Sequence, residues 1–321
     1  MFEDLLKLDS IRINFSPTGL HAINLVLCFV MFGVALGIKV SHFKNLIKNP
    51  KLAVTGLCSQ LIGLPLITFI LIIIFNKYLT PTVCMGMILV ASCPGGNISN
   101  FFTSYSRGNT ELAVGLTATE TLFAPITTPF NFALWGTLYN NFINNHAGHL
   151  LKNTLTIDTW QVFETVFLLL GIPLLIGVLF TKQFPEISLK IKKPIQNLSL
   201  GIFVGMIVMM FMNNVDLFLK YIYFIFIIVF VHNAMGLITG YIVATVSKLS
   251  DINRRTLTIE TGIHNSGLGL LLLFNPKIFA YDMQIGGMIF VVAWWGIWHL
   301  VSGLSLSVYW HNKALKSSIR N

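Results

Sequence analysis

Residues 92–129 read SCPGGNISNFFTSYSRGNTELAVGLTATETLFAPITTP, and the interpretation of the chain starts from this stretch. A Gly-Gly pair at 95–96, an Arg-Gly-Asn sequence at 107–109 and two prolines interrupt an otherwise apolar segment. Hydroxyl, amide and carboxylate side chains lie between these interruptions. An unpaired backbone polar group costs several kcal/mol in lipid, so a broken helix persists only inside protein or against a cavity. The stretch therefore predicts a binding site within a membrane protein.

The composition is that of a polytopic membrane protein. Of 321 residues, 55% are hydrophobic and 10% are charged, whereas soluble domains carry about 25% charged residues. The net charge of +9 does not indicate nucleic-acid binding, because the basic residues stand in short segments between apolar runs. The four cysteines form no CxxC pair, so neither a zinc site nor a disulfide framework is expected. We also expect no cleaved signal peptide.

Apolar runs predict an all-α protein with ten transmembrane helices, because a span needs about 20 largely apolar residues. After an amphipathic lead-in at 1–17, the predicted spans are 18–38, 50–75, 81–96, an interrupted 98–121, 124–139, 158–181, 192–212, 219–247, an interrupted 254–273 and 284–311. These spans form two sets of five. The predicted organisation is a first repeat at 1–139, a connecting loop at 140–157, a second repeat at 158–311 and a cytoplasmic tail at 312–321.

Two halves of five spans each would enter the membrane from opposite sides, because five is odd. In each half the fourth span, helix 4 or helix 9 of the chain, is the interrupted one. Paired broken helices at corresponding positions are typical of transporters built from inverted repeats, with the site at the repeat interface. We therefore predict two inverted repeats whose broken helices cross. No strong residue-level repeat accompanies this pattern, so the prediction depends on hydropathy and on the breaks.

The distribution of Lys and Arg predicts that both termini are cytoplasmic, by the positive-inside rule. With the amino terminus inside, thirteen basic residues fall in inner segments: Lys7, Arg12, Lys77, Lys182, Lys190, Lys192, Lys193, Lys248, Arg254, Arg255, Lys313, Lys316 and Arg320. Seven fall in outer segments: Lys39, Lys44, Lys48, Lys51, Lys152, Lys220 and Lys277. The four lysines of the first outer loop oppose this orientation.

Acidic side chains at membrane depth are costly and indicate function. Glu111, Glu120 and Glu260 are the candidates, and Glu260 lies in TLTIETGIHNSGLG at 256–269 among hydroxyls, amides and glycines. Unwound carbonyls, hydroxyls, amides and one carboxylate are suitable ligands for a hard monovalent cation. The alternative for Glu260 is an ion pair or a helix cap. Glu120 is either a neutral acid bonded to Thr117 or Thr121, which burial favours, or a proton-linked group.

The first broken helix offers further oxygens, from Ser99, Asn100, Thr103, Thr117 and Thr119. If the two broken helices cross, oxygens of both surround an ion whose charge Glu260 balances. The helices that start after Gly108 and near Asn265 would direct their positive dipole ends into the same cavity, where a substrate carboxylate is stabilised. Coupled uptake of sodium and an organic anion follows as the hypothesis.

The motifs CPGGNISN at 93–100, SRGNTELAV at 106–114, APITTP at 124–129 and ETGIHNSGLG at 260–269 resemble those of the bile acid:sodium symporter family. The resemblance extends over essentially the whole chain. It implies a core domain of spans 3–5 and 8–10 and a panel domain of spans 1, 2, 6 and 7. It also implies that the substrate is a bile acid or a smaller organic anion such as pantoate or pyruvate, carried with one or two sodium ions.

The same resemblance implies particular ligands. The first sodium site would consist of Ser99, Asn100, Thr117 and Glu260, with Ala113 standing where members often have a hydroxyl. The second site would consist of Gln60, Glu260, the carbonyls of Thr261 and Ile263, and His264. Members usually have Gln in place of His264, and a neutral imidazole has one acceptor at most, so this ion is either lost or pH-sensitive. The substrate would contact Asn97, Asn265 and His299.

These features predict a secondary transporter of the cell membrane, of bacterial inner-membrane type, that imports a small organic anion with sodium by alternating access. No organic cofactor, nucleic acid or obligate protein partner is expected. The first alternative is proton-coupled or uncoupled transport through His264 and Glu120. A membrane-embedded enzyme is the second, but His232, His264 and His299 lie on different spans and no HExxH or GxSxG motif occurs. A sensor leaves the two oxygen-lined breaks unexplained.

Overall fold

The computed structural model of the protein describes residues 2–9, 17–38, 40–146, 159–212, 215–275, 278–279 and 283–320. These residues are helical apart from short turns and two extended breaks. Within the described residues, four helices are long and apolar enough to cross a membrane, namely 50–75, 163–183, 220–246 and 286–315. The polytopic helical membrane protein predicted from composition is therefore confirmed.

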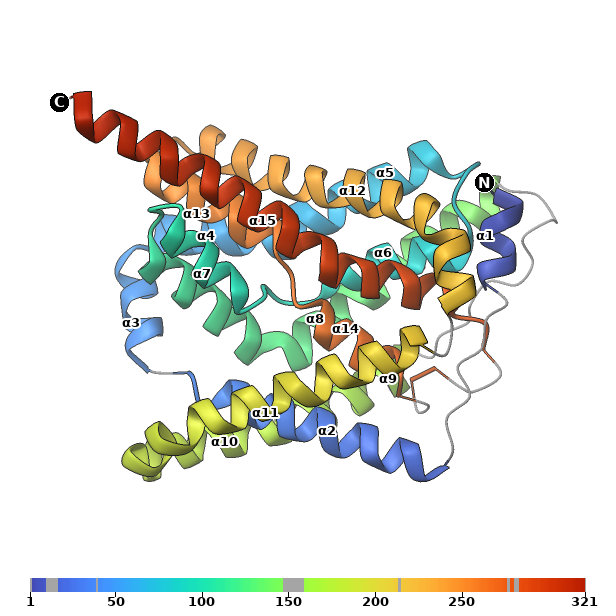
Figure 1. Ribbon diagram of the computed structural model, residues 1–321, viewed down its shortest axis with the longest axis horizontal. Coiled ribbons are helices and arrows are strands. Elements are labelled where there is room, and N and C mark those ends of the chain that lie inside the picture. The colour runs from blue at the N-terminus through green and yellow to red at the C-terminus, as the bar shows by residue number, and fades with distance from the viewer. Residues whose placement is uncertain are drawn as a thin grey trace.

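The described helices run along the long axis of the molecule in nine passes (Figure 1). Continuous or broken, these passes are α2 (Pro17–Ala35); α4 (Pro50–Cys58) with the π-helical turn Ser59–Gly63 and α5 (Leu64–Phe75); α6 (Pro81–Ser92) with α7 (Ile98–Tyr105); α8 (Thr110–His146); α9 (Thr159–Val166) with the π-helical turn Phe167–Gly171 and α10 (Ile172–Gln183); α11 (Pro185–Met212); α12 (Val215–Val246); α13 (Asp251–Gly262) with α14 (Ser266–Leu273); and α15 (Gly286–Arg320). Two short helices, α1 (Phe2–Asp9) and α3 (Val40–Lys48), lie at opposite ends of the molecule.

The predicted spans at 81–96, 98–121 and 124–139 are wrong in their boundaries. Residues 81–105 form one pass, broken between Ser92 and Ile98, and residues 110–146 form one long helix. The chain reverses at 106–109, where Arg107 has a φ of 58° and Gly108 donates its N–H to the carbonyl of Thr103. Pro125 and Pro129 lie inside α8 without ending it. Hydropathy does not distinguish such a reversal from a break in mid-pass.

In the second half, the five predicted spans agree with the structure. The predicted spans 158–181, 192–212, 219–247 and 284–311 correspond to α9–α10, α11, α12 and α15, and the interrupted span 254–273 corresponds to α13 and α14. The predicted lead-in at 1–17 contains α1, while residues 10–16 lie outside the described part. Of the predicted loop at 140–157, residues 140–146 continue α8, and the remainder lies outside the described residues.

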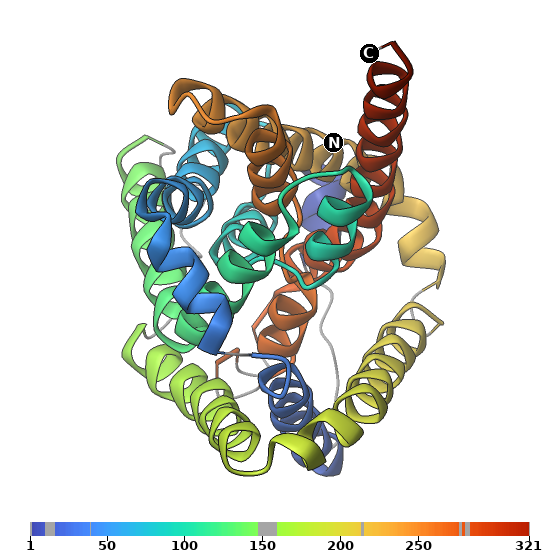
Figure 2. The ribbon, with the colours of Figure 1, turned by 90° about the vertical axis from the view of Figure 1, so that its left-hand side faces the viewer.

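Helices α2, α9, α10 and α11 form a layer of their own, here called the lateral layer (Figures 1 and 2). Helix α2 packs on α10 and α11, and α9 touches α8 of the main body. Residues 50–75 were expected in a panel domain together with 18–38, but α4 and α5 pack on α6, α8 and α12 instead. The main body therefore contains both broken passes together with α4, α5, α8, α12 and α15.

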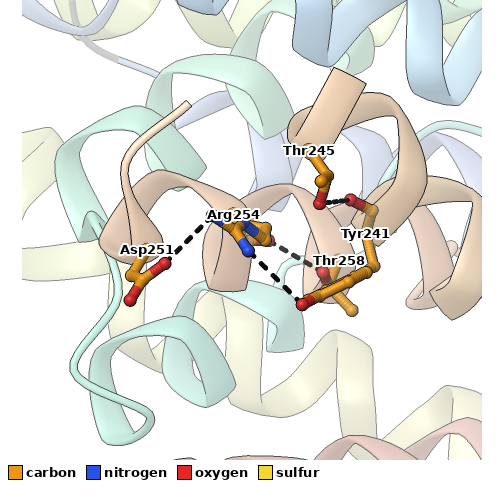
Figure 3. A network of polar contacts seen from close by, with 5 residues as sticks. All are labelled: Tyr241, Thr245, Asp251, Arg254 and Thr258. Atoms are coloured by element: carbon orange, nitrogen blue, oxygen red, sulfur yellow. Dashed lines mark hydrogen bonds and ion pairs between the residues drawn. The ribbon is translucent and has the colours of Figure 1, made fainter. Parts of the chain in front are cut away.

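Helices α12 and α13 form a tight hairpin within the main body. Gly236 and Gly240 on α12 let the helices approach closely: a Cβ at Gly240 would lie 2.5 Å from the carbonyl oxygen of Leu257. Small residues four apart are a common means of close helix packing in membranes. At the closed end of the hairpin, beside the turn at 247–250, Arg254 forms an ion pair with Asp251 at 3.0 Å and donates to the hydroxyl of Tyr241 (Figure 3). This hairpin fixes the helix that carries Glu260.

The short helix α1 docks on the main body through Asp9, which is buried. Its carboxylate accepts hydrogen bonds from Thr80 at 2.8 Å and from Thr82 at 2.5 Å, at the start of α6. Burial raises the pKa of Asp9 to about 6, and the hydrogen bonds from Thr82 and Thr80 oppose this rise. The amino-terminal segment is thereby attached to the first broken pass, at the end of the molecule opposite the carboxyl terminus (Figure 1).

Candidate functional site at the crossing of the two breaks

The breaks in the two broken passes meet and pair with each other. Gly95 and His264 form an antiparallel β-bridge. The N–H of Gly96 donates to the carbonyl of Ile263, and the N–H of Asn265 donates to the carbonyl of Pro94, both at 2.8 Å. Backbone polar groups freed by the breaks are thus satisfied by the opposite break, as they must be where water is absent. The interrupted span predicted at 254–273 does cross a second broken helix here, but its partner is the pass 81–105 and not the predicted span 98–121.

Two glycines, Gly95 and Gly96, lie where the two breaks approach each other. A Cβ at Gly96 would lie 3.2 Å from the carbonyl oxygen of His264, against backbone that cannot easily shift. A Cβ at Gly95 would lie 2.9 Å from Oε1 of Gln60. Gly96 is therefore a requirement of the crossing itself and not only a helix breaker, whereas a Cβ at Gly95 would meet the end of a flexible side chain, which can shift.

Two helices, α7 and α14, begin at the crossing. The side chain of Asn265 caps α14 by accepting the N–H of Leu268 at 3.0 Å. Asn97 precedes α7, is exposed, and makes no such cap. The helix predicted to start after Gly108 was expected to contribute its dipole here, but Gly108 lies in the turn between α7 and α8. The dipole on that side belongs to α7 instead.

Glu260 is fully buried beside the crossing. Its Oε2 accepts a hydrogen bond from the hydroxyl of Thr117 at 2.8 Å, and its Oε1 has no partner in the described part of the chain. Ser99 lies beside the carboxylate, but its hydroxyl is likewise without a regular hydrogen bond. The amide oxygen of Asn100 is buried and unpartnered too. Residues predicted for the first sodium site therefore bring three unused oxygens to one region. Thr119, by contrast, bonds to the carbonyl of Gly115 in its own helix.

Residues predicted for the second site are only partly free to bind an ion. Gln60 is in the π-helical turn Ser59–Gly63 and is 1% exposed, with no partner in the described chain for either amide atom. The carbonyl of Ile263 accepts from Gly96, which uses one of its two lone pairs. The hydroxyl of Thr261, which is not the predicted ligand atom, is engaged with Ser59 at 2.7 Å.

His264 is held through one of its two ring nitrogens, which leaves the other as a candidate ligand atom. Its Nδ1 lies 2.7 Å from the carbonyl oxygen of Cys93. A carbonyl only accepts, so Nδ1 carries the proton, and Nε2 is the acceptor of the neutral ring. This Nε2 has no hydrogen-bond partner among the described residues, and the residue is 1% exposed.

Glu120 is bonded differently from the sequence-based prediction, in which Thr117 or Thr121 was its partner. Thr117 donates to Glu260, and Oε2 of Glu120 instead accepts the N–H of Gly95 at 2.7 Å. The reason is that the break leaves this N–H without a helical partner, and a buried carboxylate from α8 supplies one. Glu120 is 2% exposed, and its Oε1 has no partner in the described residues.

Other candidates lie away from the crossing or bond within their own helix. Glu111 is exposed at the start of α8 and accepts from Asn45, so it does not belong to the site. Arg107 is exposed in the turn that closes α7. His299 is buried, with Nδ1 2.7 Å from the carbonyl oxygen of Trp295 one turn earlier.

Asn233 is a structural member of the site that sequence reasoning missed. It is fully buried on α12 and donates to the carbonyl of Gly262, the last residue of α13, at 2.7 Å. Ser302 of α15 donates to its amide oxygen at 2.6 Å. The available signal was a polar amide in an otherwise apolar run, IVFVHNAMG at 228–236. Asn233 therefore joins α12 and α15 to the edge of the second break.

A helical membrane protein with two broken passes that meet around buried, unpaired oxygens has the architecture of a secondary transporter. A profile of the Sodium Bile acid symporter family matches residues 24–221. The chain belongs to this family, as its motifs predicted.

Individual relatives agree with this assignment. An uncharacterized sodium-dependent transporter of Bacillus subtilis, YocS, is 28% identical over 300 residues, which are 92% of this chain and 84% of that protein. The sodium-dependent organic anion transporter of Bos taurus is 27% identical over 285 residues, 87% of this chain and 70% of that protein. The P3 protein of Bos taurus is 27% identical over 271 residues, and this chain spans 54% of its length.

Proposed function

We propose that this protein is a secondary transporter that carries a small organic anion into the cell together with sodium, by alternating access. The observation that carries this proposal is the set of buried, unpartnered oxygens of Ser99, Asn100 and Glu260 at the meeting point of two broken passes. The family, and the names of two relatives as sodium-dependent transporters, support sodium as the coupling ion.

The surroundings of Glu260 favour a bound cation. A fully buried carboxylate is unstable without a counter-charge, and no basic side chain in the described chain bonds to it. Hydroxyl, amide and carboxylate oxygens are hard ligands, which suit an alkali cation better than a transition metal. Sodium at this position would neutralise Glu260 and join α7, α8 and α13. Its arrival and departure would thereby be linked to the state of the crossing.

The anion is proposed to bind next to the same crossing. The amino-terminal ends of α7 and α14 begin there, and each provides a partial positive charge suited to a carboxylate. Asn97 and Asn265 stand at these two helix starts, and His299 is the third proposed contact.

The arrangement of helices suggests how access could alternate. We propose that the lateral layer serves as the panel and that the main body serves as the core, the two moving relative to each other. Inverted pairs within the nine passes would be α2 with α11, α4–α5 with α12, α6–α7 with α13–α14, and α8 with α15. The pass α9–α10 then has no counterpart, so the first repeat has four spans and the second has five.

Charge indicates the orientation of the nine passes. Fourteen basic residues of the described chain lie at the end where α15 finishes: Lys44, Lys48, Lys51, Arg107, Lys182, Lys190, Lys192, Lys193, Lys248, Arg254, Arg255, Lys313, Lys316 and Arg320. Three lie at the other end: Lys7, Lys77 and Lys220. By the positive-inside rule we propose that the carboxyl terminus is cytoplasmic and that the amino terminus is outside. This replaces the expectation that both termini are cytoplasmic.

Sodium-dependent uptake tests the proposed function. Purified protein is screened by thermal shift against organic anions with and without sodium, and hits are assayed for uptake into proteoliposomes. A ligand present at about 100 times its Kd stabilises the folded state by about 2.7 kcal/mol. We expect Glu260→Gln to lose both the sodium-dependent shift and uptake, whereas the exposed control Glu111→Gln keeps them. Undiminished sodium-dependent uptake by folded Glu260→Gln contradicts the proposal, and uptake driven by a proton gradient without sodium favours the proton-coupled alternative.

A further inference from the structure

Helix α3 buries one face against the main body and exposes a face that is both basic and apolar. Leu46 packs in a buried cluster with residues of α8. The opposite face carries an exposed stripe at helical spacing that continues into α4, formed by Lys44, Ile47, Lys48 and Lys51. Ile47 is 75% exposed although it is apolar. The helix runs across the direction of the passes (Figure 1), as a helix that lies in a membrane interface does.

The reversal between α10 and α11 has the same character and lies at the same end of the molecule (Figure 1). Phe184 in the reversal and Leu189 in α11 are exposed apolar residues, and Leu189 is 65% exposed. Exposed lysines flank them on both helices, namely Lys182, Lys190 and Lys193. The stripe on α3 and α4 and this reversal are together called the basic interfacial surface.

Acidic side chains are scarce on the basic interfacial surface. Residues 40–58 contain none, and Glu186 is the only one in residues 180–198. Glu111 approaches α3 from α8, but its carboxylate is bonded to the amide of Asn45. The surface therefore has a strong excess of positive charge, and its complementary partner is an anion.

The apolar residues among the lysines show which kind of anion fits. A dissolved anion gains nothing from Ile47 or Leu189, whereas a lipid leaflet lets such side chains enter the acyl boundary while lysine stems extend to the headgroups. The depth also agrees. Exposed apolar residues of α10, Leu175 and Leu179, precede Lys182, so the lysines begin where the lipid-facing part of the helix ends.

We propose that the basic interfacial surface binds the headgroups of anionic phospholipids. Lysines clustered next to membrane-spanning helices are attracted to an anionic leaflet. Helix α3 connects α2 of the lateral layer to α4 of the main body, and the reversal belongs to the lateral layer. Bound headgroups would thus contact both parts that the proposed function moves relative to each other. The binding itself requires neither the ion nor the substrate.

The test is lipid selectivity of the purified full-length protein in phosphatidylcholine nanodiscs. Spin-labelled phosphatidylglycerol and spin-labelled phosphatidylcholine are compared by the fraction of each that the protein immobilises. We expect phosphatidylglycerol to be preferred by about fivefold or more, the effect of a single lysine near an anionic surface. Salt at about 1 M, where the Debye length is about 3 Å, should remove most of this preference.

Variants locate the preference on the surface. Each of two triple variants should lower it, and their combination should bring it close to parity: Lys44→Gln with Lys48→Gln and Lys51→Gln, and Lys182→Gln with Lys190→Gln and Lys193→Gln. The matched control removes three exposed lysines at the opposite end and should keep the preference: Lys7→Gln with Lys77→Gln and Lys220→Gln. Unchanged melting temperatures verify that the variants are folded.

Four outcomes would overturn the inference. An undiminished preference in the combined variant would remove the surface from lipid binding, and an equal loss in the control would make net charge the cause. A preference that persists in about 1 M salt would not be electrostatic. Displacement of the labelled lipid by soluble polyphosphate at the same phosphate concentration would assign the surface to a soluble polyanion. The proposed function fails separately, since no transport is measured here.

Discussion

At the scale of single residues, Asn233 shows how the crossing is held in shape. Its amide joins the carbonyl of Gly262 to the hydroxyl of Ser302, and so connects the end of α13 to α15 through α12. The carbonyl of Gly262 lies at the end of a helix and has no later turn to accept from. The proposed ion site depends on where α13 stops, so this buried amide would act on the site without being one of its proposed ligands.

Asn233→Leu tests this role. The substitution keeps the volume but leaves the carbonyl of Gly262 without its donor, at a cost of about 1–3 kcal/mol. We expect a lower melting temperature and weaker sodium affinity, measured by thermal shift across a sodium titration. Ser302→Ala removes only the second hydrogen bond and should have a smaller effect of the same sign. Unchanged melting and sodium affinity in Asn233→Leu would show that the amide is dispensable.

Sequence reasoning predicts residues whose signal is local and misses those whose role depends on a distant partner. Ser99, Asn100 and Glu260 are polar residues next to glycine breaks, so their place near the crossing could be predicted from the pattern. The partner of Glu120 could not be predicted, because it is the backbone N–H of Gly95, freed only by the conformation of the break. Asn233 had a local signal, a buried amide in an apolar helix, that was not used.

At the scale of elements, the close contact of α12 with α13 determines where Glu260 is placed. Gly236 and Gly240 face α13, and a Cβ at Gly240 would meet backbone atoms at 2.5 Å from Leu257 and 2.9 Å from Thr258. Backbone atoms cannot rotate out of the way as a flexible side chain can. An added methyl group must therefore move one helix relative to the other.

Gly240→Ala is expected to destabilise the protein by about 1–3 kcal/mol through overpacking, and to weaken sodium binding because α13 is displaced. Gly205→Ala on α11 is the matched control, because a Cβ at that position meets no atom of another element within 4 Å among the described residues. Alanine has a higher helix propensity than glycine by about 1 kcal/mol, so the control should be neutral or more stable. Thermal melting and sodium-dependent shifts compare the two. Equal behaviour of the two variants would show that α12 and α13 tolerate separation.

Elements were predicted best where polar breaks and chain reversals look different in sequence. In the second half, the break at 263–265 directly precedes the apolar run of α14, and the reversal at 247–250 is flanked by the charged residues Lys248 and Asp251, so the two look different in sequence and the boundaries agree. In the first half, the Pro-Gly-Gly break and the Arg-Gly-Asn turn both interrupt apolar sequence, and their roles were interchanged. Pro125 and Pro129 added a false boundary, since α8 continues through both.

At the scale of the whole molecule, one element boundary changes the topology. Merging three predicted spans into one broken pass and one long helix gives nine passes instead of ten, so the termini lie at opposite ends (Figure 1). The same change moves Lys44, Lys48 and Lys51 from the minority side to the side that carries the other basic clusters. The charge pattern that opposed the ten-span topology therefore supports the nine-pass topology.

Labelling of introduced cysteines in whole cells tests this topology. Glu3→Cys places an exposed thiol on α1, and Lys313→Cys places one near the end of α15, on opposite sides of the membrane if the chain crosses nine times. We expect a membrane-impermeant maleimide to label Glu3→Cys in intact cells, and to label Lys313→Cys only after permeabilisation. Wild type measures the background from the four native cysteines. Protection of both positions in intact cells would indicate an even number of crossings with both termini inside. Labelling of Lys313→Cys but not of Glu3→Cys in intact cells would indicate nine crossings in the opposite orientation.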